Sequence, residues 1–205
     1  MQDKPKSNLF NTIAPAYAWY YQYQFQHYKS VLHAVWEKLG LSNYNNILDV
    51  GCGTGALAAA FNERRYRVTG IDPAKKMLAQ AQKRPENQGI DFLQANAHES
   101  LPFEDKRFDL SIASYVAHGL SKSERLRMYV EMSRVTRSKV IIFDYNQTRS
   151  WTTSFVEWLE HGDYFNFIKD PKSELENCFS SVSIIDVDVR AAWYVCQPLQ
   201  AESPS

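Results

Sequence analysis

The chain has 205 residues, 44% of them hydrophobic and 22% charged, a composition typical of globular proteins that argues against a fibrous or disordered chain. Lys and Arg together number 23, as do Asp and Glu, so no net charge draws the chain to nucleic acid or an anionic membrane, and we expect neither as a partner. No apolar run approaches the roughly 18–20 residues that span a bilayer, and the first residues do not resemble a signal peptide, so we expect a single cytoplasmic domain over residues 1–205.

Residues 1–40 are predicted to form a helical lid. Seven aromatic side chains fall between Pro15 and Tyr28, ahead of the first strand, in a part of the chain that a sheet does not require. Tyr17 and Tyr20 combine an apolar ring with a polar hydroxyl, as residues that close over a ligand do, and they are candidates for a substrate pocket. The alternative for most of these aromatic residues is ordinary packing of an amphipathic helix.

Residues 45–145 are predicted to form the core of a parallel sheet. Short runs rich in β-branched residues alternate there with stretches of helical period, which is typical of stacked βαβ units. The predicted strands are 46–50, 66–71, 90–93, 108–113 and 139–143, and the predicted helices are 56–63, 74–83 and 122–135. Asp72 and Pro73 predict an N-cap and a first helical position, and Ser121 and Glu124 have the spacing of a capping box.

The segment Ile-Leu-Asp-Val-Gly-Cys-Gly-Thr-Gly at residues 47–55 joins the first predicted strand to a helix that begins near Ala56. Glycines at alternate positions let the backbone turn sharply and let a ligand approach closely, so this loop is predicted to cradle a ligand. The same residues satisfy the G-x-G-x-x-A dinucleotide fingerprint, so a nicotinamide cofactor is an alternative.

Two acidic residues bear on the choice of ligand. Asp49 lies two residues before the first glycine of the loop, where a carboxylate opposes a pyrophosphate but suits a ligand that carries ammonium and sulfonium charges. Asp72 ends the second predicted strand, where an acidic side chain can accept both hydrogen bonds of a ribose diol. The alternative for Asp72 is a plain helix cap.

The last third of the chain is predicted to hold a helical substrate cap over residues 146–180 and a terminal strand pair over 181–197. Trp151, Phe155 and Trp158 recur at helical spacing. The extended runs 183–189 and 192–196 are joined by too few residues for a parallel crossover, so they should pair antiparallel at the sheet edge.

Three cysteines, Cys52, Cys178 and Cys196, are an odd number, and none has a metal-ligand spacing to another cysteine or to a histidine. We therefore expect neither a disulfide framework nor a metal site.

Three ordered blocks resemble the class I S-adenosylmethionine-dependent methyltransferases, nearest the ubiquinone and menaquinone biosynthesis branch: ILDVGCGTG at 47–55, VTGIDPAKKML at 68–78 and QANAHESLPFEDKRFD at 94–109. The resemblance implies an α/β, Rossmann-like fold. Its sheet would have seven mostly parallel strands in the order 3-2-1-4-5-7-6, one antiparallel strand in the edge region, and helices on both faces. The ligand would lie at the carboxyl ends of the strands, where the order reverses.

The resemblance also implies which residues would bind S-adenosylmethionine. These are, in chain order, Asp49, Gly51, Cys52, Gly53, Asp72, Pro73, Met77, Asn96 and Ala97. The residues of the glycine loop would line the methionine portion, Asp72 the ribose hydroxyls, the next two the adenine face and the last two the adenine edge. Asn96 stands where the family often has an aspartate.

Methyl transfer from a sulfonium is an in-line displacement, in which positioning of the nucleophile supplies much of the catalysis. If the nucleophile must lose a proton, His118, just past the fourth predicted strand, is the best-placed general base. The alternative is that His118 packs beneath the cofactor or caps a backbone group.

Tyr115 and Trp151 join Tyr17 and Tyr20 as candidates for an aromatic pocket that suits a small, largely apolar methyl acceptor, with S-adenosylhomocysteine as the second product. Two other functions stay open: an NAD(P)-dependent oxidoreductase that uses the same loop, and a module that binds S-adenosylmethionine without catalysis. The identity of the acceptor and the oligomeric state are not predicted.

Overall fold

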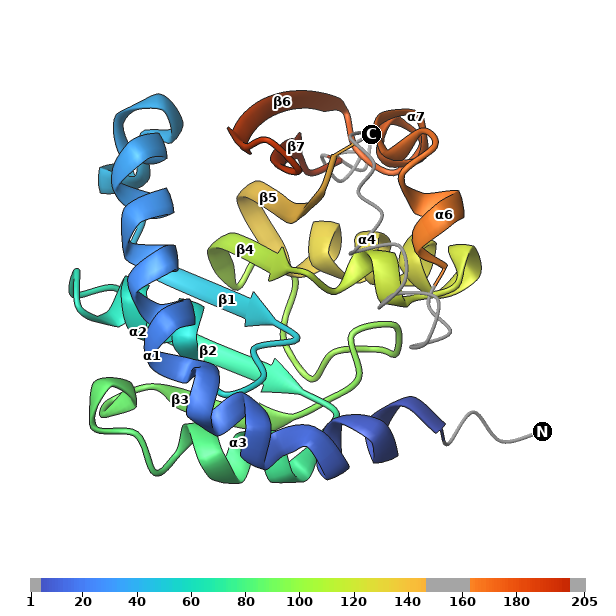
Figure 1. The fold of residues 1–205 in the computed structure, drawn as a ribbon. Coiled ribbons are helices and arrows are strands. Elements are labelled where there is room, and N and C mark those ends of the chain that lie inside the picture. The colour runs from blue at the N-terminus through green and yellow to red at the C-terminus, as the bar shows by residue number, and fades with distance from the viewer. Residues whose placement is uncertain (1–4, 147–162, 200–205) are drawn as a thin grey trace. The chain divides into compact units, whose positions relative to one another are not determined.

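The computed structural model describes residues 5–146 and 163–199 (Figure 1). The strands are β1 (Asn46–Val50), β2 (Arg67–Asp72), β3 (Asp91–Gln94), β4 (Phe108–Ser114), β5 (Thr136–Tyr145), β6 (Ser181–Asp188) and β7 (Ala191–Gln197). They form one sheet in the order β3-β2-β1-β4-β5-β7-β6, which confirms the predicted fold class. β7 runs antiparallel to both β5 and β6, as predicted for the edge region.

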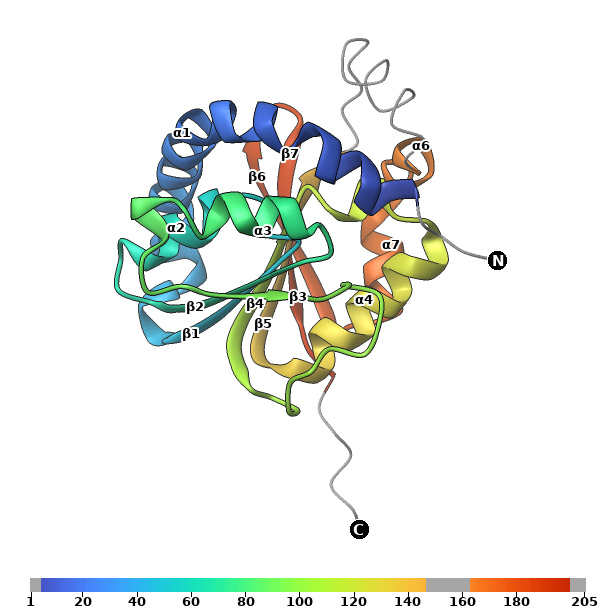
Figure 2. The same cartoon turned by 90° about the horizontal axis from the view of Figure 1, so that it is seen from below.

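The chain divides after Ala97 into two compact units. In the first unit the structure describes the α-helices α1 (Pro5–Leu39), α2 (Ala56–Asn62) and α3 (Lys75–Ala81), with the short 3-10 helices η1 (Leu41–Asn43) and η2 (Pro85–Asn87). β2 pairs in parallel with both β1 and β3. Figure 2 shows α2 and α3 on one side of these strands, and α1 packs against both helices.

The second half of α1 belongs to the core of the first unit. Its buried side chains recur at helical spacing: Tyr21, Phe25, Tyr28, Leu32, Val35 and Leu39. For Tyr21, Phe25 and Tyr28 this is the ordinary packing of an amphipathic helix. Tyr21 is fully buried, and its hydroxyl donates a hydrogen bond to Asn87 Oδ1 (3.2 Å).

The second unit contains η3 (Ala117–Gly119), α4 (Lys122–Val135), α6 (Tyr164–Phe167) and α7 (Pro171–Glu176) beside β4 to β7. The predicted capping box begins α4: Ser121 Oγ accepts a hydrogen bond from the Glu124 backbone, and Glu124 Oε2 accepts one from the Ser121 backbone. The predicted helix around Trp151 lies outside the described residues. No helix among the described residues is long and apolar enough to cross a membrane.

One fully buried cation ties the helices of this unit together. Arg125, on α4 and 1% exposed, forms a two-pronged ion pair with Glu174 of α7 through Nε (2.6 Å) and Nη2 (3.0 Å). Its Nη1 donates to Asp163 Oδ2 (3.0 Å) and to the carbonyl of Leu120 (2.7 Å). A buried guanidinium requires this many acceptors, because an unpaired charge in the interior is strongly destabilising.

Two local predictions need correction. Asp72 and Pro73 do not cap α3, because the helix begins at Lys75 with Ala74 as its N-cap residue. The Asp72 carboxylate instead accepts hydrogen bonds from the backbone of Gly53 in the glycine loop and from the backbone of Ala74, so it connects these two segments. β5 begins at Thr136, three residues before the predicted strand, because Thr136 follows α4 directly and its hydroxyl donates to Ser111 Oγ of β4 (2.7 Å).

Candidate functional site

The glycine loop follows β1 and ends where α2 begins, as predicted (Figure 1). Gly51, Gly53 and Gly55 all have positive φ, at 72°, 53° and 81°, a backbone conformation that side chains disfavour. At Gly55 an added Cβ would lie 2.5 Å from Asn87 Nδ2, whereas at Gly53 it would meet no atom within 4 Å. Gly55 is therefore required by packing, whereas the space that a side chain at Gly53 would enter is open.

Asp49, near the end of β1, is 1% exposed, and its Oδ2 has no hydrogen-bond partner. Burial raises the pKa of Asp49 to about 7, with a smaller contribution from the nearby Asp72 carboxylate, while a hydrogen bond from the Ala58 backbone acts in the opposite direction. A buried carboxylate oxygen without a partner is costly in a protein interior. Asp49 is thus suited to a ligand that brings a positive charge.

Asp72 holds the glycine loop against the end of β2. Its Oδ2 accepts a hydrogen bond from the backbone of Gly53 (2.9 Å), and its Oδ1 accepts one from the backbone of Ala74 (2.7 Å). The side chain is 8% exposed, and burial raises its pKa, against the lowering effect of these two hydrogen bonds. Because each carboxylate oxygen has two lone pairs, Asp72 retains capacity to accept hydrogen bonds from a diol.

The remaining residues implied for the cofactor lie in the same unit. Met77, on α3, and Ala97, past β3, are buried, and Pro73 and Asn96 are partly exposed. Cys52 is buried in the loop, and an added Cβ on Gly70 would come within 2.9 Å of its Sγ. Burial, together with the carboxylates of Asp49 and Asp72, raises the pKa of the Cys52 thiol well above its usual value, so this cysteine stays protonated and is no nucleophile.

In the second unit, His118 lies in η3, after β4, and is 8% exposed. Its Nδ1 lies 2.8 Å from Oδ1 of Asp144, a residue near the end of β5 that is fully buried. Asp144 was not predicted as a site residue. An acidic residue that directly follows the apolar run Val140–Phe143 is the signal in the sequence that could have revealed it, because a charge in a buried strand requires a partner.

Aromatic rings surround His118. The ring centroids of Tyr145 and Tyr115 lie 4.9 Å and 6.4 Å from that of the imidazole, and Tyr115 also contacts Phe143 (5.0 Å). Tyr115 has a φ of 54°, although a bulky side chain rarely adopts the left-handed region. Such strain is typical of functional sites. That Tyr115 lines a substrate pocket stays a prediction.

The structure gives less detail about the other predicted pocket residues, Tyr20, Tyr17 and Trp151. Tyr20 is 44% exposed and packs against Tyr23, also on α1, at 4.7 Å between ring centroids. Tyr17 lies on α1, but the structure describes only its backbone, and Trp151 lies outside the described residues.

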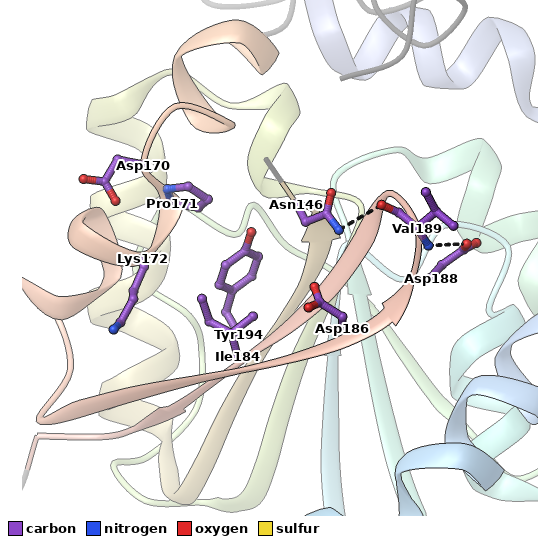
Figure 3. Close-up of a pocket in the computed structure, with 9 residues that line it drawn as sticks. All are labelled: Asn146, Asp170, Pro171, Lys172, Ile184, Asp186, Asp188, Val189 and Tyr194. Atoms are coloured by element: carbon purple, nitrogen blue, oxygen red, sulfur yellow. Dashed lines mark hydrogen bonds between the residues drawn. The ribbon is translucent and has the colours of Figure 1, made fainter. Parts of the chain in front are cut away.

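A cavity of about 610 Å³ opens on the second unit between the start of α7 and the β6–β7 hairpin (Figure 3). Its lining residues are Asn146, Asp170, Pro171, Lys172, Ile184, Asp186, Asp188, Val189 and Tyr194. The hydroxyl of Tyr194 donates to the carbonyl of Tyr145 (3.0 Å), so the cavity adjoins the strand that carries Asp144. None of these nine residues was predicted as a site residue. No group of three or more potential metal ligands occurs in the described part of the chain.

Comparison with known proteins shows which proteins the chain is similar to. Residues 47–139 match the family described as a methyltransferase domain. A phosphatidylethanolamine N-methyltransferase of Cereibacter sphaeroides is 37% identical over 95 residues, which are 44% of this chain and 45% of the relative. A demethylmenaquinone methyltransferase of Thermotoga maritima is 36% identical over 100 residues, 47% of this chain and 41% of the relative. The chain therefore spans less than half the length of either protein.

Among solved structures, a SAM-dependent methyltransferase from Aquifex aeolicus superimposes with a TM-score of 0.61 and 17% identity, over 82% of this chain and 89% of that one. At this identity the likeness supports the fold alone. Residues 47–139 thus match a methyltransferase domain, and the sequence blocks, the strand order and the glycine-loop geometry are those that the resemblance to the class I, S-adenosylmethionine-dependent methyltransferases implies.

Proposed function

We propose that this protein transfers the methyl group of S-adenosylmethionine to a small, largely apolar acceptor. The observation that carries the proposal is the buried Oδ2 of Asp49, which lacks a hydrogen-bond partner and adjoins a glycine loop with three positive φ angles. The ammonium group of S-adenosylmethionine would supply the missing partner, and the glycine backbone would admit the methionine portion. A pyrophosphate would bring two further negative charges toward Asp49, which disfavours a nicotinamide dinucleotide at the same loop.

Further residues of the first unit fit the remainder of the cofactor. Asp72 would accept hydrogen bonds from the ribose hydroxyls while it continues to hold Gly53 and Ala74. Pro73 and Met77 would contact the adenine face, and Asn96 and Ala97 its edge. When bound, S-adenosylmethionine supplies a methyl carbon on a positively charged sulfur, which an acceptor can attack in line.

His118 is the residue that we propose as general base for an acceptor that must lose a proton. Its imidazole is held by the Asp144 carboxylate and is flanked by Tyr115 and Tyr145, so its orientation is defined. These rings would also provide the apolar surface that a small acceptor requires. Positioning by such a pocket can supply a large part of the rate enhancement even before a base contributes.

Two relatives differ in the acceptors that their names give, one a phosphatidylethanolamine and the other a demethylmenaquinone. An acceptor panel should therefore contain quinols, phenols, amines, thiols and carboxylates, with formation of S-adenosylhomocysteine as the common readout.

Calorimetry tests the cofactor directly. We expect S-adenosylmethionine and S-adenosylhomocysteine to bind and NAD(H) and NADP(H) not to bind. Tight nicotinamide binding alone would overturn the methyltransferase assignment. Binding of S-adenosylmethionine without turnover of any acceptor would favour the non-catalytic module.

A further inference from the structure

Asp144 takes part in more hydrogen bonds around His118 than a simple backbone cap requires. The backbone N–H groups of Ala117 and His118 donate to Oδ2 of Asp144 (3.0 and 3.3 Å), and that of Tyr145 donates to Oδ1 (2.8 Å). Asp144 therefore receives three backbone hydrogen bonds in addition to its contact with the imidazole. The carboxylate is fixed in place within a fully buried position.

These hydrogen bonds determine which nitrogen of the His118 imidazole carries the proton. A carboxylate that accepts from three N–H groups acts toward its fourth partner as an acceptor too, so Nδ1 of His118 donates to Oδ1. In a neutral ring the proton on Nδ1 leaves the lone pair on Nε2, at the opposite side of the ring. Asp144 thus selects the tautomer in which Nε2 can take a proton.

The orientation of the ring is fixed as well. Tyr145 and Tyr115 meet the imidazole at interplanar angles of 67° and 71°, so rotation of the ring away from Asp144 would displace an aromatic neighbour. Tyr115 keeps its place despite a left-handed backbone, and its N–H donates to the carbonyl of Phe143 (2.8 Å). Strain that is held in this way beside a histidine is expected where orientation matters for function.

We propose that Asp144 is a positioning residue that holds His118 as the Nδ1–H tautomer, and that the pair serves an acceptor whose hydroxyl group is methylated. This inference rests on the proposed function. The hydroxyl proton passes to Nε2 of His118, the oxygen lone pair forms the new bond to the methyl carbon, and the carbon–sulfur bond breaks with its electron pair left on sulfur. The products are a methyl ether, S-adenosylhomocysteine and a protonated imidazole.

The pair favours a hydroxyl acceptor over an amine. A hydroxyl oxygen is a weak nucleophile until its proton is removed, so a fixed base contributes about 10²- to 10⁴-fold to the rate. A neutral amine already presents its lone pair and loses its proton after transfer, so it has little use for a base that is prepared in advance. The tautomer selected by Asp144 is therefore expected to matter more for a hydroxyl acceptor than for a neutral amine.

The first experiment is nitrogen NMR of the full chain labelled with ¹⁵N-histidine, at a pH where the imidazole is neutral. We expect the His118 signals of the unmodified protein to show the Nδ1–H tautomer, and those of Asp144→Asn to show a shift toward Nε2–H. This measurement needs neither cofactor nor acceptor, so it tests the pair even if the proposed function fails. An Nε2–H tautomer in the unmodified protein would overturn the proposal.

The second experiment measures kcat and KM for Asp144→Asn, His118→Gln and the double variant, with phenol and amine acceptors. For a phenol we expect kcat to fall about 10²- to 10⁴-fold in each single variant, with KM little changed and no further loss in the double variant, because Asp144 acts through His118. Glu131→Gln is the matched control, since it breaks a partly buried ion pair with Arg134 elsewhere in the same unit. Its kcat should stay normal.

Three results would contradict the proposal or its basis, and they can be told apart. Independent, multiplicative losses from the two single variants would show that Asp144 acts on the fold and not through His118. Equal losses with amine and phenol acceptors would contradict the hydroxyl assignment. An Nδ1–H tautomer together with no methyl transfer to any acceptor would leave the pair intact and refute the proposed function instead.

Discussion

The carboxylate of Asp72 and the backbone N–H of Gly53 are joined by a hydrogen bond of 2.9 Å, although they are 19 residues apart in the chain. The other oxygen of Asp72 accepts from Ala74, two residues later. One side chain therefore connects the middle of the glycine loop to the segment that leads into α3. Asp72 shapes the loop before any ligand binds, so its structural and ligand-binding roles must be separated by experiment.

We expect Asp72→Ala to lower both the free energy of unfolding and the affinity for S-adenosylmethionine. The variant leaves two backbone N–H groups without their partner, each worth about 1–3 kcal/mol where it is buried, and it removes the proposed acceptor of the ribose hydroxyls. Thermal unfolding and calorimetry on the same protein measure the two effects. Asp91→Asn, at an exposed position on β3, should change neither quantity.

The outcome that would end the ribose assignment is a lower melting temperature at unchanged affinity. Unchanged stability with weaker binding would instead show that the two backbone hydrogen bonds contribute little to the fold.

The pKa of Asp49 predicts how stability depends on pH. The folded value of about 7 lies above the ordinary value of 3.8, so between these two values the folded protein holds a proton that the unfolded chain has lost. The contribution of Asp49 to stability therefore falls as pH rises from about 4 to about 7 and is constant above that. Asp49→Asn removes this contribution, so its unfolding free energy should fall less between pH 5 and pH 8 than that of the unmodified protein.

Urea unfolding at several pH values measures this difference. Without S-adenosylmethionine, the Asn variant should be the more stable protein at pH 8, because the ionised carboxylate is buried without a full set of partners. With the cofactor present the order should reverse, since the proposed ammonium contact is lost in the variant. Identical pH profiles for the two proteins would show that Asp49 ionises in the folded state as readily as in the unfolded chain.

Sequence patterns predicted the core of the fold because local signals and packing agree there. The strand 46–50, the helix 122–135 and its capping box match the structure, since β-branched runs and the cap residues Ser121 and Glu124 act over a few residues. The predicted start of α3 was wrong, because the helix begins at Lys75 and Asp72, the predicted N-cap, also forms a hydrogen bond with Gly53, a partner that is distant in the chain. A capping pattern in the sequence cannot reveal a hydrogen-bond donor that lies far away in the chain.

Arg125 provides a test of the helices in the second unit. We expect Arg125→Ala to lower the free energy of unfolding by about 3–5 kcal/mol, because the carboxylates of Glu174 and Asp163 lose a buried counter-charge. The control is Lys172→Ala on α7, whose ion pair with Glu176 is half exposed at both side chains and is worth about 0–1 kcal/mol. Urea unfolding of both variants gives the comparison, and equal small losses would mean that Arg125 contributes no more than a surface pair.

The candidate site was predictable only in part, for a related reason. The glycine loop and Asp49 are contiguous in sequence, so their pattern stands out. The partners of His118 are dispersed: Asp144 is 26 residues away, and its role becomes visible only when parallel pairing of β4 with β5 brings their ends together. The strain at Tyr115 likewise has no counterpart in the sequence, because a tyrosine gives no signal for positive φ.

Adjacent tyrosines on α1 offer a matched pair of substitutions that separates packing from function. Tyr21→Phe removes a buried hydrogen bond to Asn87, whose Nδ2 in turn donates to the carbonyl of Thr54 in the glycine loop (3.1 Å). We expect it to lower the free energy of unfolding by about 1–3 kcal/mol, because Asn87 Oδ1 is left without that donor.

Tyr20→Phe removes a hydroxyl from a side chain that is 44% exposed, so it should leave stability unchanged. If Tyr20 orients the acceptor, as we predict, this variant should lower kcat at an unaltered melting temperature. A normal kcat for Tyr20→Phe would reduce Tyr20 to a surface residue of α1, whatever the effect of Tyr21→Phe on stability.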